Sequence, residues 1–529
     1  MHRRDFLKNT IAAIGGVALS LDGSAQSENG SNVGERQPND AAKADRPNFV
    51  FVLSEAQGWT NSSVQMDPNI PNSRSDFYRT PNLERLSESG IRFSDFYAPS
   101  PRCTPSRASF FTGKSPAKLH MTFVSERGPT NPKILEPNVL LEMPLEETTI
   151  AELLKTTGYA TAHFGKWHVG RIHPSRHGFD ESDGATSNGG PQNVQHPNPK
   201  QAYAITASGI DFMTRQVEAA KPFYLQISHY AARRADDATE DSYRTVLGWP
   251  GAAEGDQAGQ AACLLDLDIT IGMILNKLRE IGIADNTFVI YSTDHGTPGW
   301  NRPLTNGKGT VSEGGLRVPL IISGPGIDKN SFSNVRTSGV DLFPTIAQLA
   351  RVKQNLPKGL EGGSLVPLLT NARRGKVKRD REELIFHVPH YDKDSRGPAS
   401  VILLGKYKLI RIYETGKRLL FDLSTDISER NDLADIMPEK VEELDQRMTE
   451  YLKEVNAQMP RINPNYDPDK PLTPDERQRG RRDAGRNRKD GERRGDRGGG
   501  ENRRGRNREE GGSRQGLTGV GKNSENPDR

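Results

Sequence analysis

The sequence predicts an α/β protein, in which a large sandwich of helices around a mainly parallel sheet precedes a small antiparallel sheet with one helix. Two observations predict the large sheet. Short β-branched and aromatic runs alternate with helical stretches, and polar residues directly follow several of these runs. A third observation predicts the small sheet, because strand-like runs beyond about residue 384 follow one another without helices between them.

The first run, residues 48–53 (NFVFVL), is continuously apolar and ends at a polar turn, which indicates a buried strand. Similar runs lie at residues 159–164, 223–228, 287–292 and 318–323. Helical stretches are expected between these runs at residues 81–89, 145–157, 202–219, 261–281 and 341–349. The polar residues after the runs include Glu55, Lys166 and Asp294. Because ligands of such sheets bind beyond the carboxyl ends of the strands, we expect the functional site there.

The C-terminal part of the folded body has a different pattern. Short strands are expected at residues 383–387, 400–404, 407–413 and 418–421, followed by a helix at residues 438–457. We therefore divide the body into a main domain at residues 47–380 and a small C-terminal α+β subdomain at residues 381–460.

Both ends of the chain differ in composition from the body. Residues 1–25 combine Arg3-Arg4, an apolar stretch and a small-residue cleavage site, which is typical of a twin-arginine signal peptide. The mature protein is then expected to be periplasmic or secreted, and we expect no stable membrane span. Residues 26–46 are predicted to be a linker. Residues 461–529 are predicted to be a disordered tail rich in Arg and Gly.

The slight basicity of the chain belongs to its tail. Of 72 Lys and Arg and 68 Asp and Glu, residues 471–529 hold 17 and 11, so the remainder is slightly acidic. This distribution does not favour a nucleic-acid partner for the body. The two cysteines, Cys103 and Cys263, exclude a disulfide-rich scaffold and a thiolate zinc cluster. The oligomeric state cannot be predicted.

Residues 100–107 read SPRCTPSR, and a Cys-x-Pro-Ser-Arg pentapeptide that leads into a helix is the modification signature of type I sulfatases. Three further blocks match that family: GKWHVG at residues 165–170, NGKGT at residues 306–310 and EGGLRVP at residues 313–319. From about residue 48 to about residue 456 the chain thus resembles the formylglycine-dependent sulfatases of the alkaline-phosphatase-like superfamily. The resemblance implies an alkaline-phosphatase-like fold, with residues 47–380 as the catalytic domain.

The resemblance implies that Cys103 is converted to formylglycine by a formylglycine-generating enzyme. One hydroxyl of the hydrated aldehyde would attack sulfur, and collapse of the second would expel sulfate. It also implies that Arg107 holds the modified residue, that Lys166 and Lys308 contact the sulfate, and that His168 assists the nucleophile or the ester. Cations at these places stabilise charge that develops on the sulfate oxygens.

The family also implies one divalent cation, usually calcium, held by oxygen ligands. Asp294 and His295 match one of its ligand pairs. The other pair departs from the pattern, since Glu55 stands at the first Asp and Ala56 at the second. We expect a rebuilt site in which Gln57 supplies a carbonyl oxygen and Cys103, once modified, is a further ligand.

A second departure follows residues 223–228, where the family usually has Pro-His and this sequence has Ala232-Arg233. We expect Arg233 to bind a sulfate or a carboxylated sugar through its planar guanidinium, with His229 as a further candidate for substrate binding.

The expected function is that of an exported sulfatase acting on a sulfated small molecule or polysaccharide. One alternative is a pseudo-sulfatase that binds sulfated glycans, because Ala56 and Arg233 depart from the pattern. Another is a phosphonate or phosphate monoester hydrolase on the same scaffold.

Overall fold

A mixed sheet crosses the centre of the part of the chain that the computed structural model describes, residues 46–126, 128–188, 201–299, 301–370 and 375–470. In spatial order its strands are β10 (Ser331–Ser333), β2 (Gly90–Phe93), β9 (Leu320–Ser323), β8 (Thr287–Thr293), β1 (Asn48–Ser54), β7 (Phe223–Ser228), β5 (Ala160–Gly165) and β6 (Glu181–Ser182). Strand β9 runs antiparallel to both of its neighbours, β2 and β8. The other neighbouring pairs of this sheet are parallel, which confirms the predicted mainly parallel sheet.

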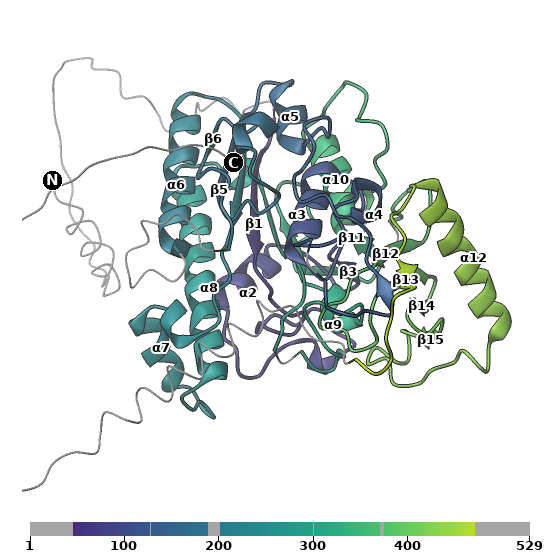
Figure 1. Cartoon of the computed structure of the whole chain (residues 1–529). Coiled ribbons are helices and arrows are strands. Elements are labelled where there is room, and N and C mark those ends of the chain that lie inside the picture. The colour runs from purple at the N-terminus through teal and green to yellow at the C-terminus, as the bar shows by residue number, and fades with distance from the viewer. Residues whose placement is uncertain (1–45, 127, 189–200, 300, 371–374, 471–529) are drawn as a thin grey trace, which may run out of the picture. The chain divides into compact units, whose positions relative to one another are not determined.

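Helices cover both faces of this sheet, as Figure 1 shows. One face carries α3 (Cys103–Thr112), α5 (Ile150–Lys155), α10 (Leu342–Leu349) and α11 (Val366–Leu369). The other carries α2 (Pro81–Glu88), α6 (Ala202–Glu218), α7 (Glu240–Leu247) and α8 (Asp256–Glu280). Side chains alternate between the faces along β1, so Phe49 and Phe51 enter one apolar cluster and Val50 and Val52 the other. Burial on both faces explains why the sequence of β1 is apolar throughout.

Helix α8 is long and apolar enough to span a membrane by length and composition, but 72% of its most apolar window is buried inside the body. Its buried carboxylates bind neighbouring elements. Asp268 accepts hydrogen bonds from the backbone N–H groups of Asn82 and Leu83 at the start of α2. Asp266 accepts from the hydroxyl groups of Thr239 and Ser242 at the start of α7. This packing is that of a core helix.

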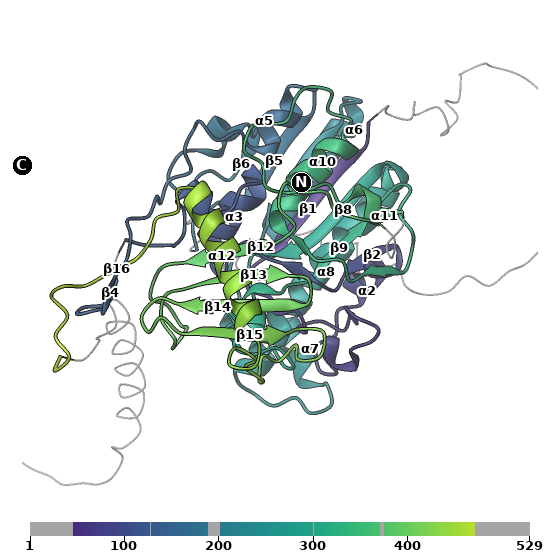
Figure 2. The same cartoon turned by 90° about the vertical axis from the view of Figure 1, so that its right-hand side faces the viewer.

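The C-terminal subdomain is an antiparallel sheet of β12 (Leu384–Val388), β13 (Ala399–Leu404), β14 (Tyr407–Ile412) and β15 (Arg418–Asp422), with α12 (Pro438–Glu454). Figure 2 shows α12 lying across this sheet. One apolar cluster joins α12 to the sheet, and another joins the opposite face to Tyr97, Val311 and Leu316 of the main domain. The small sheet is therefore packed between α12 and the main domain.

Several boundaries differ from the sequence-based expectations. The helix expected at residues 145–157 begins only at Ile150, because Thr149 and Glu152 form a capping box there. Short strands that the patterns did not predict pair across the chain: β3 (Phe96–Tyr97) with β11 (Thr337–Ser338), and β4 (Ile134–Leu135) with β16 (Arg461–Ile462). Within the described residues, the remaining short helices are α4 (Pro116–Leu119), α9 (Glu313–Leu316), η1 (Pro71–Ser73), η2 (Pro174–His177), η4 (Ala235–Asp237), η5 (Ala284–Asn286) and η6 (Gly339–Asp341).

The predicted start of the tail at residue 461 is corrected by β16. Its pairing with β4 is continued by Asn131, whose side-chain amide donates to the carbonyl oxygens of Asp467 and Lys470. Residues 461–470 therefore pack on the body, because their backbone finds hydrogen-bond partners there. The predicted signal peptide (1–25), the predicted linker up to residue 45 and the tail from residue 471 lie outside the described residues.

Candidate active site

The carboxyl ends of three parallel strands meet the first turn of α3 at one edge of the large sheet. Glu55 follows β1, Lys166 follows β5, and Asp294 and His295 follow β8, while Cys103 is the first residue of α3. The ligand atoms of Glu55, Cys103, Asp294 and His295 lie within 4.8 Å of one another. The topology thus brings together residues that are as far apart as 240 positions in the sequence.

Arg107 lies one helical turn after Cys103 and organises the two carboxylates of this cluster. Its side chain is fully buried. The Nε atom donates to Asp294 Oδ2 at 3.1 Å, Nη2 donates to Glu55 Oε2 at 3.1 Å, and Nη1 donates to the backbone oxygen of Lys166 at 2.6 Å. The planar guanidinium therefore fixes the ends of β1, β5 and β8 relative to α3.

Two lysines also converge on Glu55. The Nζ atom of Lys166 lies 2.8 Å from Glu55 Oε2, and that of Lys308 lies 3.1 Å from Oε1. Burial alone would raise the pKa of Glu55, but the two ammonium groups hold it well below its usual value. Arg107 and the two lysines face two carboxylates, so the cluster has an excess of positive charge and attracts anions.

The orientation of His295 tests whether these residues fit the divalent cation of the family. Its Nδ1 lies 2.9 Å from the carbonyl oxygen of Gly296, so this nitrogen carries a proton. The other nitrogen, Nε2, is buried without a hydrogen-bond partner, 3.4 Å from Asp294 Oδ1 and 3.6 Å from Glu55 Oε1. A neutral imidazole would direct its lone pair at two carboxylate oxygens, which is unfavourable unless a proton or a metal cation lies between them. Burial would lower the pKa of His295, but the charge of Asp294 raises it, so a proton takes this place when no metal is bound. The residues therefore fit a divalent cation with mixed oxygen and nitrogen ligands.

Cys103 occupies the electropositive side of this cluster. Burial would raise the pKa of its thiol, but Lys166 holds that pKa well below its usual value. Nδ1 of His168 lies 3.4 Å from the hydroxyl of Thr104, the next residue of α3. His168 has a left-handed backbone (φ 57°), which turns the chain back toward α3 directly after β5. A nucleophile formed at Cys103 would therefore have both a cation and an imidazole beside it.

The structure directs Gln57, expected as a metal ligand, away from the cluster. Its side-chain nitrogen donates to the backbone oxygen of Asn61 at 2.9 Å, and its oxygen accepts from the hydroxyl of Ser54 at 3.3 Å. The cause is the left-handed backbone of Ala56 (φ 56°), whose N–H donates to Asp294 Oδ1 at 3.1 Å. Position 56 thus supplies a backbone donor, and the side-chain amide of Gln57 is bonded to Ser54 and Asn61 rather than directed at the candidate cation ligands.

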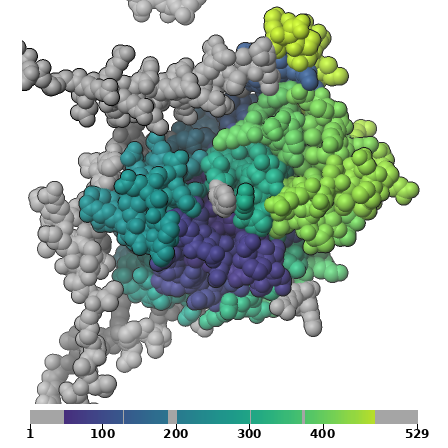
Figure 3. Space-filling view, turned by 90° about the horizontal axis from the view of Figure 1, so that it is seen from below, coloured from purple at the N-terminus to yellow at the C-terminus, as the bar shows by residue number. Residues whose placement is uncertain are grey.

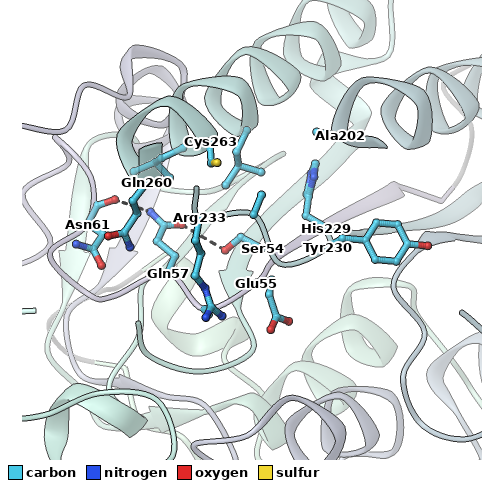
Figure 4. A pocket seen from close by; sticks show the side chains of 14 residues that line it. Ser54, Glu55, Gln57, Asn61, Ala202, His229, Tyr230, Arg233, Gln260 and Cys263 are labelled. Carbon is cyan, nitrogen blue, oxygen red and sulfur yellow. Dashed lines mark hydrogen bonds between the residues drawn. The ribbon is translucent and has the colours of Figure 1, made fainter. Parts of the chain in front are cut away.

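His229 and Arg233 line a pocket that adjoins Glu55, as Figure 4 shows. Burial and the positive charge of Arg107 lower the pKa of His229 to about 3, so its imidazole is neutral. Arg233 and Glu55 line the same pocket, and the buried Nε of Arg233 has no hydrogen-bond partner among the described residues. Arg233 is thus available to an anion, whereas neutral His229 cannot supply positive charge.

Residues of the C-terminal subdomain also border this site, and no sequence motif marks them. Arg102, the residue before Cys103, forms an ion pair with Asp392 of the loop after β12. The next residue in that loop, Lys393, is an exposed cation near the site. No sequence signal marks this loop, because its position depends on tertiary contacts.

The fold and this cluster define an alkaline-phosphatase-like protein with a buried cysteine between cations and carboxylates. A family model described as Sulfatase matches residues 47–352, and one described as N-sulphoglucosamine sulphohydrolase, C-terminal, matches residues 306–458. The chain belongs to the sulfatase family.

Characterised members of the family are similar over most of the described body. N-acetylgalactosamine-6-sulfatase of Sus scrofa is 30% identical over 366 residues, which are 62% of this chain and 66% of that protein. Arylsulfatase A of Homo sapiens is 30% identical over 69% of this chain and 75% of that protein. The ulvan-active sulfatase of Formosa agariphila is 27% identical over 73% and 77%. The chain thus spans just under two thirds of the first relative.

Two solved structures show the same fold at low identity. The crystal structure of Ps i-CgsB in complex with k-i-k-neocarrahexaose has a TM-score of 0.65 at 22% identity, covering 78% of this chain and 94% of that chain. The phosphonate monoester hydrolase SpPMH from Silicibacter pomeroyi has a TM-score of 0.56 at 18% identity, covering 80% and 100%.

Proposed function

We propose that this chain is an exported sulfatase that hydrolyses sulfate esters of carbohydrates. The observation that carries the proposal is the placement of Cys103 at the start of α3, beside a cluster in which Arg107, Lys166 and Lys308 outnumber the carboxylates. A sulfate ester beside this residue would have its charge balanced by the lysines. The relatives named for N-acetylgalactosamine 6-sulfate and for ulvan support a sulfated carbohydrate as the substrate class.

Catalysis would require two groups that this chain binds or forms. Formylglycine at position 103, made by a formylglycine-generating enzyme, would supply a nucleophilic hydroxyl and a second hydroxyl whose collapse to the aldehyde releases sulfate. A divalent cation, with calcium as the family precedent, would be held by Glu55, Asp294, His295 and the modified Cys103, and would supply positive charge for the sulfate oxygens.

The other steps belong to side chains of this chain. Lys166 and Lys308 would orient the sulfate oxygens and stabilise the charge that develops on them and on the leaving oxygen. His168, beside Thr104, is placed to hold or deliver a proton near position 103. Arg107 would keep Glu55 and Asp294 in place while the charge of the substrate changes. Arg233 would bind the sulfate or a neighbouring acidic group, since a guanidinium is a poor proton donor.

One experiment separates the proposed function from two alternatives. Ala56 and Arg233 would suit a pseudo-sulfatase that binds sulfated glycans, and the scaffold is shared with a phosphonate monoester hydrolase. We would purify the exported protein, measure the mass of the peptide containing Cys103, and assay an aryl sulfate beside an aryl phosphate. We expect formylglycine at position 103, turnover of the sulfate, and loss of that turnover with retained fold in Cys103→Ala.

Other results would favour the alternatives. An unmodified thiol with turnover of neither ester would favour the glycan-binding protein, and faster turnover of the phosphate would favour the monoester hydrolase. Undiminished sulfate turnover by Cys103→Ala would refute the assignment of the nucleophile.

Export is proposed from residues 1–25, because Arg3 and Arg4 precede an apolar stretch. Replacement of both arginines by lysine should retain the protein in the cytoplasm with its signal uncleaved. Unchanged export of the double variant, measured by cell fractionation, would contradict a twin-arginine route.

A further inference from the structure

A groove with a cavity volume of about 500 Å³ has Lys308 in its wall and lies between the loop before α9 and the C-terminal subdomain. The cations that line it are Arg302, Lys308, Lys393 and Arg430. None of the described residues that line it is Asp or Glu. Figure 3 shows the face on which the purple surface after β1 and the green surfaces of these later segments meet. A strongly basic groove therefore continues outward from the lysine of the active site.

The loop that carries Lys393 has its own acidic residues neutralised. Asp392, before Lys393, is paired with Arg102. Asp394, after it, is 2.7 Å from the guanidinium of Arg396 and accepts a hydrogen bond from the N–H of Val311 at 3.2 Å. These contacts fix the loop against Arg102 and against the segment that follows Lys308, and each carboxylate is bound to an arginine rather than to the ammonium group of Lys393.

Lys393 and Arg430 have no partner of their own. Neither side chain forms an ion pair or a hydrogen bond with any residue that the structure describes, and both are exposed. Partial burial and the positive charges of Arg102, Lys308 and Arg233 lower the pKa of Lys393, although the charge of Asp392 acts in the opposite direction. Cations that crowd together with a net excess of positive charge destabilise a folded protein, and such an arrangement is expected where a ligand supplies the missing negative charge.

We propose that this groove binds a second anionic group of the substrate, a sulfate or carboxylate on a sugar next to the one that is desulfated. The inference rests on the proposed function, in which Lys308 contacts the sulfate that is cleaved. Arg430 offers a planar fork that fits either oxyanion, and Lys393 a mobile point charge. An ester with a single sulfate would leave both cations uncompensated. The substrate is therefore a multiply charged oligosaccharide or polysaccharide, and Lys393 and Arg430 select for it.

The test measures binding in the Cys103→Ala background, so that its outcome does not depend on turnover. Calorimetric titrations would use short dextran sulfate, neutral dextran, oligogalacturonate, single-stranded DNA and inorganic sulfate. The variant carries Lys393→Ala and Arg430→Ala. The matched control carries Lys329→Ala and Lys453→Ala, two exposed lysines outside the groove that form no ion pair with the described residues.

We expect the groove variant to bind dextran sulfate at least about tenfold more weakly, because it loses two charge-assisted contacts to the ligand. The slope of log K against the logarithm of the salt concentration should be shallower for the groove variant than for the parent by roughly 1.5, because each lost contact contributes about 0.7–0.9. The affinity for inorganic sulfate should change less than about twofold, because a single anion occupies the central site. The control should bind dextran sulfate within about twofold of the parent, and neutral dextran should not bind.

Tighter binding of dextran sulfate than of oligogalacturonate identifies the second group as a sulfate, and the reverse order identifies a carboxylate; either supports the groove. Three results would overturn the proposal. The affinity for dextran sulfate could fall equally in the groove variant and in the control. The protein could bind neither dextran sulfate nor oligogalacturonate, or it could bind single-stranded DNA as tightly as dextran sulfate. Failure of the proposed function itself would show separately, as absence of aryl sulfate turnover by the unmutated protein.

Discussion

Lys408 of β14 reaches from the small sheet into the main domain, where its Nζ lies 2.9 Å from Oε1 of Glu313 with both side chains fully buried. A second carboxylate, Glu429, lies 2.8 Å from the same ammonium group. The hydroxyl of Tyr97 donates to the other oxygen of Glu313 at 2.8 Å. Glu313 follows Lys308 by five residues, so this pair attaches the loop of the active-site lysine to the C-terminal subdomain.

Replacement of Lys408 by Met should lower the free energy of unfolding by about 3–5 kcal/mol, because it leaves two buried carboxylates facing each other. Urea unfolding would measure the loss. The exposed pair Lys417–Asp432, at 3.8 Å, gives the control, since Lys417→Ala should cost less than about 1 kcal/mol. Similar losses in the two variants would contradict a special role for Lys408.

The loss of unfolding free energy caused by Lys408→Met should also depend on pH. Burial and the charge of Glu313 already raise the pKa of Glu429, which Lys408 partly offsets. A carboxyl whose folded-state pKa is raised stabilises the fold when protonated, and this contribution is lost as the pH rises above the unfolded value of about 4.3. Without Lys408 the pKa of Glu429 rises further. The difference in unfolding free energy between variant and parent should therefore be smaller at about pH 5 than at about pH 8.

The sequence predicts most of the site because parallel strands present their carboxyl ends at one edge, which places Glu55, Lys166 and Asp294 together. Gln57 could not be placed in this way. The left-handed turn at Ala56 redirects its side chain to Asn61, and no alternation of apolar and polar residues reveals such a turn.

The sequence does not predict the position of Lys393 either. It depends on ion pairs between Asp392 and Arg102 and between Asp394 and Arg396. The first pair joins residues 290 positions apart in the chain. The direction of β9 illustrates the same limit for the fold. A short apolar run predicts a strand, but its antiparallel pairing with β2 and β8 depends on the connections around it.

A cation site with two carboxylates should bind calcium more tightly when a third is added. Ala56 has the left-handed conformation that Asn and Asp tolerate better than Ala, and it borders the cluster and the adjoining pocket. We expect calcium to raise the melting temperature of Ala56→Asp more than that of the parent. A cation present at a concentration 100 times its dissociation constant stabilises the folded protein by about 2.7 kcal/mol. Without calcium, Ala56→Asp should be the least stable because it adds a buried negative charge.

Ala56→Asn is the matched control, because it relieves the same backbone strain without adding charge. Its calcium-dependent shift in melting temperature should be smaller than that of Ala56→Asp, because an amide oxygen can bind calcium but adds no negative charge. Equal shifts in the parent, Ala56→Asn and Ala56→Asp would show that position 56 does not face the cation.

Buried His387 should make the protein less stable in acid. Nδ1 of His387 lies 2.6 Å from the hydroxyl of Ser400, Nε2 lies 3.0 Å from the backbone oxygen of Gln458, and burial lowers its pKa to about 4. A histidine with a lowered pKa stabilises the fold while neutral, above its unfolded value of about 6.5, and this contribution is lost as the pH falls toward 4. At about pH 4 the free energy of unfolding should be lower by about 3 kcal/mol, because each unit of difference between the folded and unfolded pKa contributes about 1.4 kcal/mol.

Urea unfolding between about pH 7 and pH 4 would test this expectation. The curve for His387→Gln should fall less steeply than that of the parent, whereas His173→Gln, at an exposed position, should follow the parent. Parallel curves for all three proteins would contradict the assignment.

Arg107 is the residue for which a conservative replacement should be least tolerated. Its guanidinium binds Glu55, Asp294 and the backbone oxygen of Lys166 at once, and a single ammonium group cannot reach all three. Arg107→Lys should therefore lower the free energy of unfolding by roughly 2–4 kcal/mol and reduce sulfate turnover by at least about a hundredfold, since both carboxylates lose their orientation.

The matched replacement Arg411→Lys alters a partly exposed pair with Asp445 at 2.6 Å. It should cost less than about 1 kcal/mol and leave turnover unchanged. The two variants separate the effect of a buried guanidinium from the general cost of exchanging Arg for Lys. A small and similar effect in both, measured by urea unfolding and aryl sulfate turnover, would mean that a single positive charge suffices at position 107 and that the planar fork does not organise the site.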